Sequence, residues 1–287
     1  MLQDLTFGKL ENEYRNVTAQ PQDLVFCIRE GNILTGTNQG KIFFPSYDQV
    51  LRWSSESQWE TWGSDTLHYL FRFQERNCFL WMGKAGECAD PDFTYTQARS
   101  MRDLENKDQC FAAMTAWHLY NWYRVNRFCG NCGATTIHDA RERMLRCPDC
   151  GNMIFPRINP AVIVAVTDGD RLVLTKYAGR AYTRYALIAG FTEIGETLEQ
   201  TVAREVMEEV GLKVKNIRYY KSQPWGVDGN ILMGFYCDLD GDDTIHLDEK
   251  ELSVGQWHHR HSLPAKDDGI SLTREMIRIF EEGKEPK

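Results

Sequence analysis

The chain has 287 residues, of which 42% are hydrophobic and 26% are charged, so it is too apolar for an intrinsically disordered protein. Its net charge of −8 argues against a protein whose whole surface binds polyanions, although a local basic patch is compatible with it. We expect folded domains and a small-molecule partner.

The sequence carries no signal for export or for membrane insertion. The N-terminal stretch MLQDLTFGKLENEYRNV has no uninterrupted apolar segment of signal-peptide length. The most apolar run, AVIVAV at residues 161–166, is too short to span a membrane and is typical of a buried strand. Nine cysteines, an odd number with four clustered, argue against a secreted disulfide framework. We expect a soluble protein of the reducing cytoplasm with no membrane association.

Residues 1–107 alternate short apolar runs with turn-rich stretches. The runs DLVFCI, KIFFPSY, LHYLFRF and CFLWMG are separated by segments such as GTNQG and KAGECADPD. This alternation predicts a β-rich N-terminal domain. No motif in it has an identifiable chemistry.

Residues 108–127 have apolar side chains at helical spacing, which predicts a connecting helix. A stripe of this kind is more often core than a binding surface. The residues expected on the buried face are Phe111, Met114, Trp122 and Val125, with Leu119 beside them.

Residues 128–156 contain two Cys-x-x-Cys pairs, Cys129 with Cys132 and Cys147 with Cys150. Two such pairs at this spacing supply four thiolates to a tetrahedral Zn²⁺ and predict a zinc ribbon. Because protein ligands fill all four positions, the zinc is expected to be structural. Three arginines between the pairs, Arg141, Arg143 and Arg146, leave nucleic-acid binding open, but such a group is more often a solvated face.

Residues 157–287 mix strands and helices. The segment AVIVAVTDGDRLVLTKY predicts a hairpin that turns at residues 168–170. A helix is expected at 198–210, because Thr197 and Gln200 form a capping box and Gly211 suits a left-handed C-cap. A last helix is expected near 272–280.

The helix at 198–210 places Glu205, Glu208 and Glu209 at positions i, i+3 and i+4, which share one face. Like charges at this spacing destabilise a helix, so a positive partner is expected. We expect the apolar side of the helix to consist of Ala203, Val206, Met207 and Val210.

The acids belong to a longer pattern, Gly190-x5-Glu196-x7-Arg204-Glu205-Val206-x-Glu208-Glu209-x-Gly211-Leu212. It resembles the signature of the Nudix hydrolases at every defined position. The resemblance implies an α/β/α sandwich around a mixed sheet, and hydrolysis of nucleoside diphosphates linked to another moiety. The fold class expected for the whole chain is α+β, with this sandwich preceded by the four-cysteine ribbon and the β-rich domain.

The Nudix resemblance implies catalytic Mg²⁺ or Mn²⁺, and hard oxygen ligands suit these ions. We expect Glu205, Glu208 and Glu209 to be ligands. By resemblance, the backbone carbonyl of Ala189 and the distal Glu251 are further ligands. A carboxylate must also deprotonate the attacking water, and either Glu209 or Glu251 could do so. Arg204 is expected to orient a glutamate, with Glu196 as the candidate.

The ribbon before the catalytic domain, together with the sequence SQPW at residues 222–225, narrows the resemblance to the NADH pyrophosphatase family, also called NAD⁺ diphosphatases. This implies cleavage of NAD(H) to NMN(H) and AMP, removal of NAD caps from RNA, and a homodimer. The substrate contacts carried over by resemblance are Arg99, Glu142, Phe155, Phe191, Gln223 and Trp225.

The loop after SQPW departs from the family pattern. The family reads S-Q-P-W-P-F-P-x-S, whereas this chain has Gly226, Val227 and Asp228 after the tryptophan. We expect the loop to be more flexible and less aromatic. An ADP-ribose or other nucleoside-diphosphate pyrophosphatase is therefore the alternative function. A non-catalytic zinc-ribbon protein that binds nucleic acid is the hypothesis from a different class.

Overall fold

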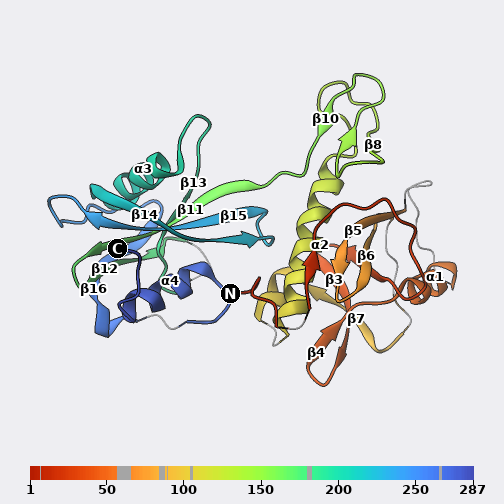
Figure 1. Cartoon of the computed structure of the whole chain (residues 1–287), viewed down its shortest axis with the longest axis horizontal. Helices are drawn as coiled ribbons and strands as arrows, with labels where there is room; N and C mark the ends of the chain where they lie inside the picture. The colour runs from red at the N-terminus through yellow and green to blue at the C-terminus, as the bar shows by residue number, and fades with distance from the viewer. Residues whose placement is uncertain are drawn as a thin grey trace. The chain divides into compact units, whose positions relative to one another are not determined.

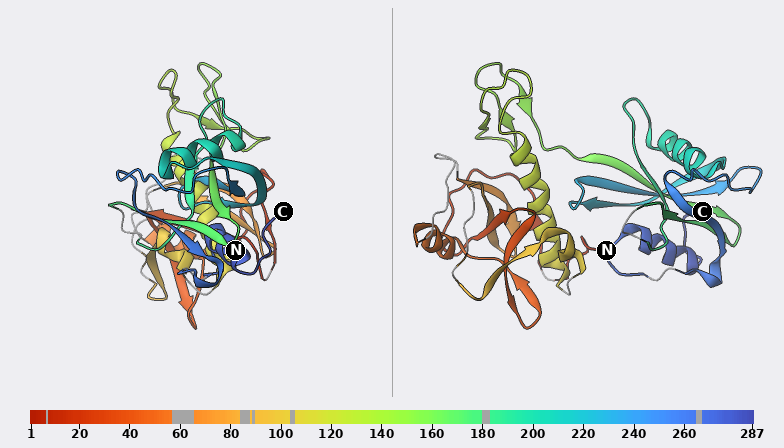
Figure 2. Two further views of the ribbon diagram at one scale, coloured as in Figure 1. Left: turned by 90° about the vertical axis from the view of Figure 1, so that its left-hand side faces the viewer. Right: turned by 180° about the vertical axis from the view of Figure 1, so that it is seen from behind.

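The computed structural model describes residues 1–6, 8–56, 66–83, 88, 90–103, 106–179, 183–264 and 267–287. Contacts divide the chain into two compact units (Figures 1 and 2). One unit contains Met1, Ile158–Trp225 and Asn230–Lys287, and the other contains Leu2–Arg157 and Gly226–Gly229. None of the helices in the described ranges is long and apolar enough to cross a bilayer.

The N-terminal part of the second unit is built on a sheet of seven strands, which confirms the β-rich prediction. The order is β1-β5-β6-β2-β3-β4, with β7 paired to β3, and β2 and β6 run parallel. The bounds are β1 Leu10–Glu11, β2 Leu24–Arg29, β3 Asn32–Asn38, β4 Lys41–Phe43, β5 Leu67–Phe73, β6 Arg76–Trp81 and β7 Phe93–Gln97. A 3₁₀ helix, η1 Ala98–Asp103, follows β7.

The run KIFFPSY was expected to be a strand, but it is divided between β4 and the start of helix α1, Tyr47–Glu56. Ser46 explains the start of the helix. Its hydroxyl accepts a hydrogen bond from the Gln49 N–H at 3.3 Å, and the Gln49 side chain accepts one from the Ser46 N–H at 2.9 Å. Most of the predicted turn KAGECADPD lies outside the described residues.

The predicted connecting helix is α2, Lys107–Val125, but its buried face differs from the expected one. Met114 and Trp122 are buried as predicted, whereas Val125 is 63% exposed. The face instead contains small residues, Cys110, Ala113 and Ala116, and these allow close packing against neighbouring segments.

The ribbon contains three short antiparallel strands, β8 Ile137–His138, β9 Leu145–Arg146 and β10 Met153–Ile154, in the order β10-β9-β8. Arg146 lies opposite both Ile137 and Met153. Cross-strand partners point to the same side of a sheet, so these three side chains share one face.

The first unit contains a mixed six-stranded sheet within the described residues. Its order is β14-β15-β11-β12-β16, with β13 paired to β11, and only β11 and β15 run parallel among these pairs. The bounds are β11 Asn159–Asp168, β12 Arg171–Tyr177, β13 Ile188–Phe191, β14 Val214–Trp225, β15 Asn230–Leu239 and β16 Leu252–His259. The predicted hairpin is confirmed, because Asp168 pairs with Arg171 across the turn.

Helices α3, Leu198–Val210, and α4, Leu272–Glu281, cover opposite faces of this sheet (Figures 1 and 2). Strand β11 shows why. Val162, Val164 and Val166 pack in the cluster that includes α3, whereas Ile163 and Ala165 pack in the cluster that includes α4. Side chains alternate along a strand, so an apolar run such as AVIVAV serves both layers. The predicted α/β/α sandwich is confirmed. A short 3₁₀ helix, η2 Arg260–Ser262, precedes α4.

Candidate active site

The end of β13 and helix α3 meet at Gly190. This glycine pairs with Val162 of β11, and the Glu205 carboxylate lies directly over it. A Cβ atom at Gly190 would lie 1.9 Å from the Glu205 Cδ and 2.0 Å from its Oε1. Only glycine leaves room for this carboxylate, so the first position of the signature is set by close approach.

Gly190→Ala is therefore expected to lower the free energy of unfolding by about 1–3 kcal/mol, because the methyl group must displace a packed carboxylate. Urea unfolding measures this change. Gly130→Ala is the matched control, since a Cβ there has no atom within 4 Å and is expected to change stability by less than about 0.5 kcal/mol. Equal losses in both variants would contradict the steric argument.

Arg204 is the positive partner that the clustered acids required. Its Nε donates to Glu196 at 2.6 Å, and its Nη2 donates to Glu196 at 3.0 Å and to the Phe191 carbonyl at 2.9 Å. Its Nη1 donates to Glu205 at 2.7 Å and to Glu208 at 2.9 Å. All five guanidinium N–H groups are thereby used, which fixes the geometry of three carboxylates. The expected contact with Glu196 is present.

The neighbouring acids have different electrostatic environments. Hydrogen bonds from Arg204, and then from the Glu193 N–H, lower the pKa of Glu196 to about 2. Burial raises the pKa of Glu205, Arg204 opposes that shift, and the charges of Glu208 and Glu251 add to it. The charge of Glu251 therefore acts on this site although 46 residues separate it from Glu205.

The three glutamates were expected on a face separate from the apolar side of α3, but they differ in exposure. The Glu208 side chain is 59% exposed and that of Glu205 is 12% exposed, whereas Glu209 is only 3% exposed. Glu209 follows Val202 by seven positions and Val206 by three, so it falls on the stripe that faces the sheet.

The predicted apolar side of α3 also needs correction, because Ala203 is exposed and Met207 is 42% exposed. The buried residues include Thr201 and Val202 instead. Thr201 was not predicted as part of the site, but its hydroxyl donates to Glu196 at 3.0 Å. Nothing in the local sequence pattern distinguishes this threonine from an ordinary core residue.

The carboxylate cluster suits a hard divalent cation, because its side-chain donors are all oxygens and Gly190 leaves room for the Glu205 carboxylate. In the described residues, no three carboxylates of this cluster bring their oxygens within 4.8 Å of one another. Within the described ranges, only the four cysteines bring three or more ligand atoms within 4.8 Å of one another.

The four cysteine sulfurs form a compact group, with Sγ–Sγ distances of 3.6 Å between Cys129 and Cys150 and 3.4 Å between Cys132 and Cys147. A zinc tetrathiolate with Zn–S bonds of 2.3 Å has edges of about 3.8 Å, so the group has the right size. Backbone hydrogen bonds from Cys132 and Asn131 lower the pKa of the Cys129 thiol to about 6. At Cys132 a backbone hydrogen bond from Ala134 also lowers the pKa, but the nearby Cys147 and Cys150 sulfurs outweigh it and raise the pKa to about 12. The residues present fit a structural zinc site.

Comparisons with known proteins agree with both sites. A family model described as NUDIX domain matches residues 157–279, and one described as NADH pyrophosphatase zinc ribbon domain matches residues 124–155. A protein of Photobacterium profundum named NAD-capped RNA hydrolase NudC is 37% identical over 219 residues, which are 76% of this chain and 80% of that protein. The chain belongs to the NADH pyrophosphatase family of Nudix hydrolases.

Two further relatives with the same name come from Pectobacterium atrosepticum and from an Enterobacter strain. The first is 39% identical and covers 63% of this chain and 70% of its own length. The second is 40% identical and covers 55% of this chain, and the present chain spans 61% of that relative.

The substrate contacts carried over from the NADH pyrophosphatases are divided between the two compact units. Phe191, Gln223 and Trp225 belong to the unit with the glutamates, and Arg99, Glu142 and Phe155 belong to the other. The rings of Phe191 and Phe155 are 55% and 53% exposed, so both can stack on a planar ligand. Glu142 is also exposed and Trp225 is half-buried.

Gln223 has a different role from the expected one. Its side chain is fully buried, donates to the Ile270 carbonyl at 2.8 Å and accepts from the Leu272 N–H at 2.8 Å. It therefore joins β14 to the start of α4. Because no exposed side-chain atom remains for a substrate, we do not carry Gln223 into the proposed substrate site.

The loop that departs from the family pattern is anchored, which corrects the expectation of flexibility. A Cβ atom at Gly226 would lie 2.4 Å from the Met114 carbonyl oxygen, and Val227 is 5% exposed. Asp228 accepts from Arg99 at 2.6 Å. These contacts lie inside the unit that contains Leu2–Arg157, and they replace the rigidity that prolines give the family loop.

Proposed function

We propose that this chain hydrolyses the pyrophosphate bond of NAD(H) to NMN(H) and AMP, and that it removes NAD caps from RNA. The observation that carries the proposal is the carboxylate cluster held by Arg204 over Gly190, in a chain whose four-cysteine module matches the NADH pyrophosphatase zinc ribbon. The relatives named NAD-capped RNA hydrolase support the RNA substrate.

Bound Mg²⁺ or Mn²⁺ would neutralise the pyrophosphate charge and lower the pKa of an attacking water. The residues that would hold it are Glu205, Glu208, Glu209, Glu251 and the carbonyl of Ala189. Arg204 positions Glu205 and Glu208 through the hydrogen bonds described above.

A carboxylate must accept the proton of the attacking water. Glu251 is exposed, whereas Glu209 is 3% exposed, so the structure supports Glu251 as the base and Glu209 as a ligand. Phe191 directly follows Gly190, over which the Glu205 carboxylate lies. Its exposed ring would stack on a base of the dinucleotide. Glu142, Phe155, Trp225 and Arg99 are further proposed substrate contacts.

Product analysis tests the proposal. With Mg²⁺ or Mn²⁺ present, NADH is expected to yield NMNH and AMP, identified by chromatography. ADP-ribose is the second candidate substrate, because the loop after Trp225 has lost the phenylalanine and prolines of the family. Turnover of ADP-ribose equal to or better than that of NADH would assign ADP-ribose as the substrate and leave the proposed pyrophosphate hydrolysis unchanged.

We further propose a homodimer in the cytoplasm that does not associate with membranes. The resemblance to the NADH pyrophosphatase family implies the assembly, and none of the nine cysteines forms a disulfide in the described residues, which suits a reducing compartment. Light scattering of the purified protein measures the assembly, and a monomer at micromolar concentration would contradict it.

A further inference from the structure

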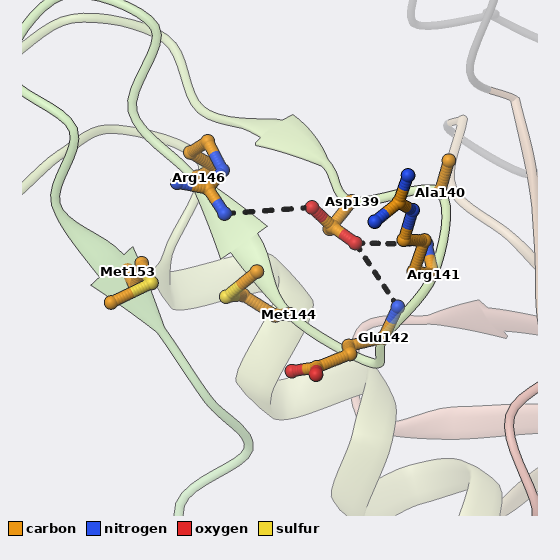
Figure 3. Close-up of a pocket in the computed structure, with 7 residues that line it drawn as sticks. All are labelled: Asp139, Ala140, Arg141, Glu142, Met144, Arg146 and Met153. Atoms are coloured by element: carbon orange, nitrogen blue, oxygen red, sulfur yellow. Dashed lines mark hydrogen bonds and ion pairs between the residues drawn. The ribbon is translucent and has the colours of Figure 1, made fainter.

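The ribbon contains a cavity of about 380 Å³ (Figure 3). Its lining residues are Asp139, Ala140, Arg141, Glu142, Met144, Arg146 and Met153. Glu142 is one of the proposed substrate contacts, so the cavity adds no separate site. The turn that follows Trp225, another proposed contact, is held by residues that do not line this cavity.

The turn between β14 and β15 consists of the four residues Gly226–Gly229. Trp225 pairs with Asn230, so the last residue of β14 and the first of β15 close the turn. A glycine stands at each end of the turn, and glycine loses more conformational freedom on ordering than any other residue. A turn of this composition keeps one conformation only where contacts from outside the turn hold it.

Helix α2 supplies the first of these contacts. A Cβ atom at Gly226 would lie 2.4 Å from the Met114 carbonyl oxygen and 3.5 Å from the His118 Cβ, so the turn packs directly on the helix. His118 lies one helical turn after Met114, and its Nε2 is 2.9 Å from the Arg157 carbonyl oxygen. The next residue of the turn, Val227, is buried. The same face of α2 therefore holds both Gly226 and Arg157.

The second contact is an ion pair from η1. The Arg99 Nη2 donates to the Asp228 Oδ1 at 2.6 Å. On either side of Arg99, Ala98 and Met101 are fully buried, and the Ala98 N–H donates to the Gly31 carbonyl at 3.0 Å. The backbone that carries Arg99 is therefore fixed by the core around the N-terminal sheet, and the guanidinium fastens Asp228 to it.

We infer that Asp228 is a positioning residue for substrate binding, an inference that rests on the proposed function. Through Arg99 it holds the turn, and the turn is continuous with Trp225, a proposed wall for the base. A turn that is ordered before binding does not have to be ordered by the substrate, and this raises affinity. The β-rich part of the chain, in which no motif has an identifiable chemistry, thereby takes part in binding.

The pair between Arg99 and Asp228 acts on affinity and leaves the catalytic step unchanged. The hydrogen bonds that Arg204 donates to the carboxylates of the signature do not involve the turn. The side chains of Arg99 and Asp228 are 64% and 40% exposed, so water screens the pair and limits its effect. A moderate change in KM with an unchanged kcat is the expected result of breaking it.

The test is a charge reversal, assayed on NADH. Asp228→Asn removes the ion pair and is expected to raise KM about two- to fivefold, the range that an exposed pair allows. Arg99→Asp and Asp228→Arg each place like charges opposite one another, so each is expected to raise KM at least as much. The double variant Arg99→Asp/Asp228→Arg restores the pair with reversed polarity and is expected to return KM to within about twofold of the wild type.

A direct contact between Arg99 and the substrate gives different results. Asp228→Asn would then release the guanidinium and lower KM, and the double variant would stay as impaired as Arg99→Asp. Either result would overturn the inference. So would a loss of kcat equal to the gain in KM, because the pair would then act on the catalytic step.

Asp240→Asn is the matched control. Lys215 of β14 and Asp240, which follows β15, form an exposed pair at 3.0 Å at the end of the two strands away from the turn. Its loss is expected to leave KM unchanged. Gly226→Ala breaks the other anchor without a change of charge, because its methyl group must move the turn away from Met114. It is expected to raise KM in the same direction, and an unchanged KM would contradict the anchoring.

Equilibrium binding of NADH without a divalent cation, measured by the fluorescence of the dihydronicotinamide, separates the inference from the proposed function. A wild-type protein that cleaves no NADH, but whose affinity for it falls in Asp228→Asn and returns in the double variant, would refute the function and keep the inference. Hydrogen exchange of residues 226–229 measures the positioning itself. Exchange is expected to be about two- to fivefold faster in Asp228→Asn, and unchanged exchange would overturn the inference.

Discussion

Glu208→Gln is expected to lower kcat on NADH by about 10²–10³-fold, because it removes one charge from the cluster proposed to bind the divalent cation. Glu208 is the most exposed of the four glutamates in the Nudix signature, with 59% of its side chain accessible. Glutamine keeps its size and its place beside Arg204. The loss of kcat should therefore come from the catalytic step and not from unfolding of the protein. Steady-state kinetics measure the catalytic effect, and urea unfolding measures the effect on stability.

The stability cost of this change should be small. The pair between Arg204 and Glu208 is an i, i+4 contact on an exposed helix surface, worth about 0.3–0.5 kcal/mol. Glu199→Gln is the matched control, because Glu199 is exposed in the first turn of the same helix and contacts none of the site residues named above. Unchanged kcat in Glu208→Gln would remove Glu208 from the catalytic site, whereas unchanged biological behaviour of a variant that has lost turnover would favour the non-catalytic hypothesis.

Loss of the structural zinc is the second large effect that we expect. Cys147→Ser replaces a buried ligand, and we expect the zinc content to fall from about one ion per chain to none. The free energy of unfolding should fall by at least about 3 kcal/mol, because a module this small has little core without its metal. Metal analysis and thermal unfolding measure both quantities.

Cys88→Ser is the control for this experiment. Cys88 is a half-buried free thiol outside the four-cysteine group, so its variant should keep its zinc. Retention of zinc by Cys147→Ser, or an unchanged melting temperature after the ion is lost, would contradict a structural role for the metal.

The motifs that depend on local spacing were predictable. The capping box at Thr197 and the left-handed cap at Gly211 fix the ends of α3, so the positions of Arg204 and its acids along that helix follow from the sequence. The two cysteine pairs are local in the same sense. Each pair lies in one tight turn, and the four sulfurs gather because the ribbon strands between the pairs are short.

Burial was less predictable, because it depends on segments far away in the chain. Val125 has the right spacing for a buried helix face but is exposed, and Gln223 lies in a family specificity stretch but is buried against the start of α4, 49 residues away. Arg143 resembles its neighbouring arginines in sequence, yet it binds a carbonyl 73 residues earlier.

The sequence by itself thus determined the family: the four thiolates, the spacing of the glutamates and the first glycine of the Nudix signature, and a buried strand at residues 161–166. These depend on side chains a few positions apart, whose relative directions are set by helical and strand geometry. Only the tertiary structure decided that Glu209 faces the sheet, that the altered loop is anchored through Gly226 and Asp228, and that two ribbon arginines border a cavity. Those properties require surfaces from distant segments to meet, and no local periodicity encodes which surfaces do so.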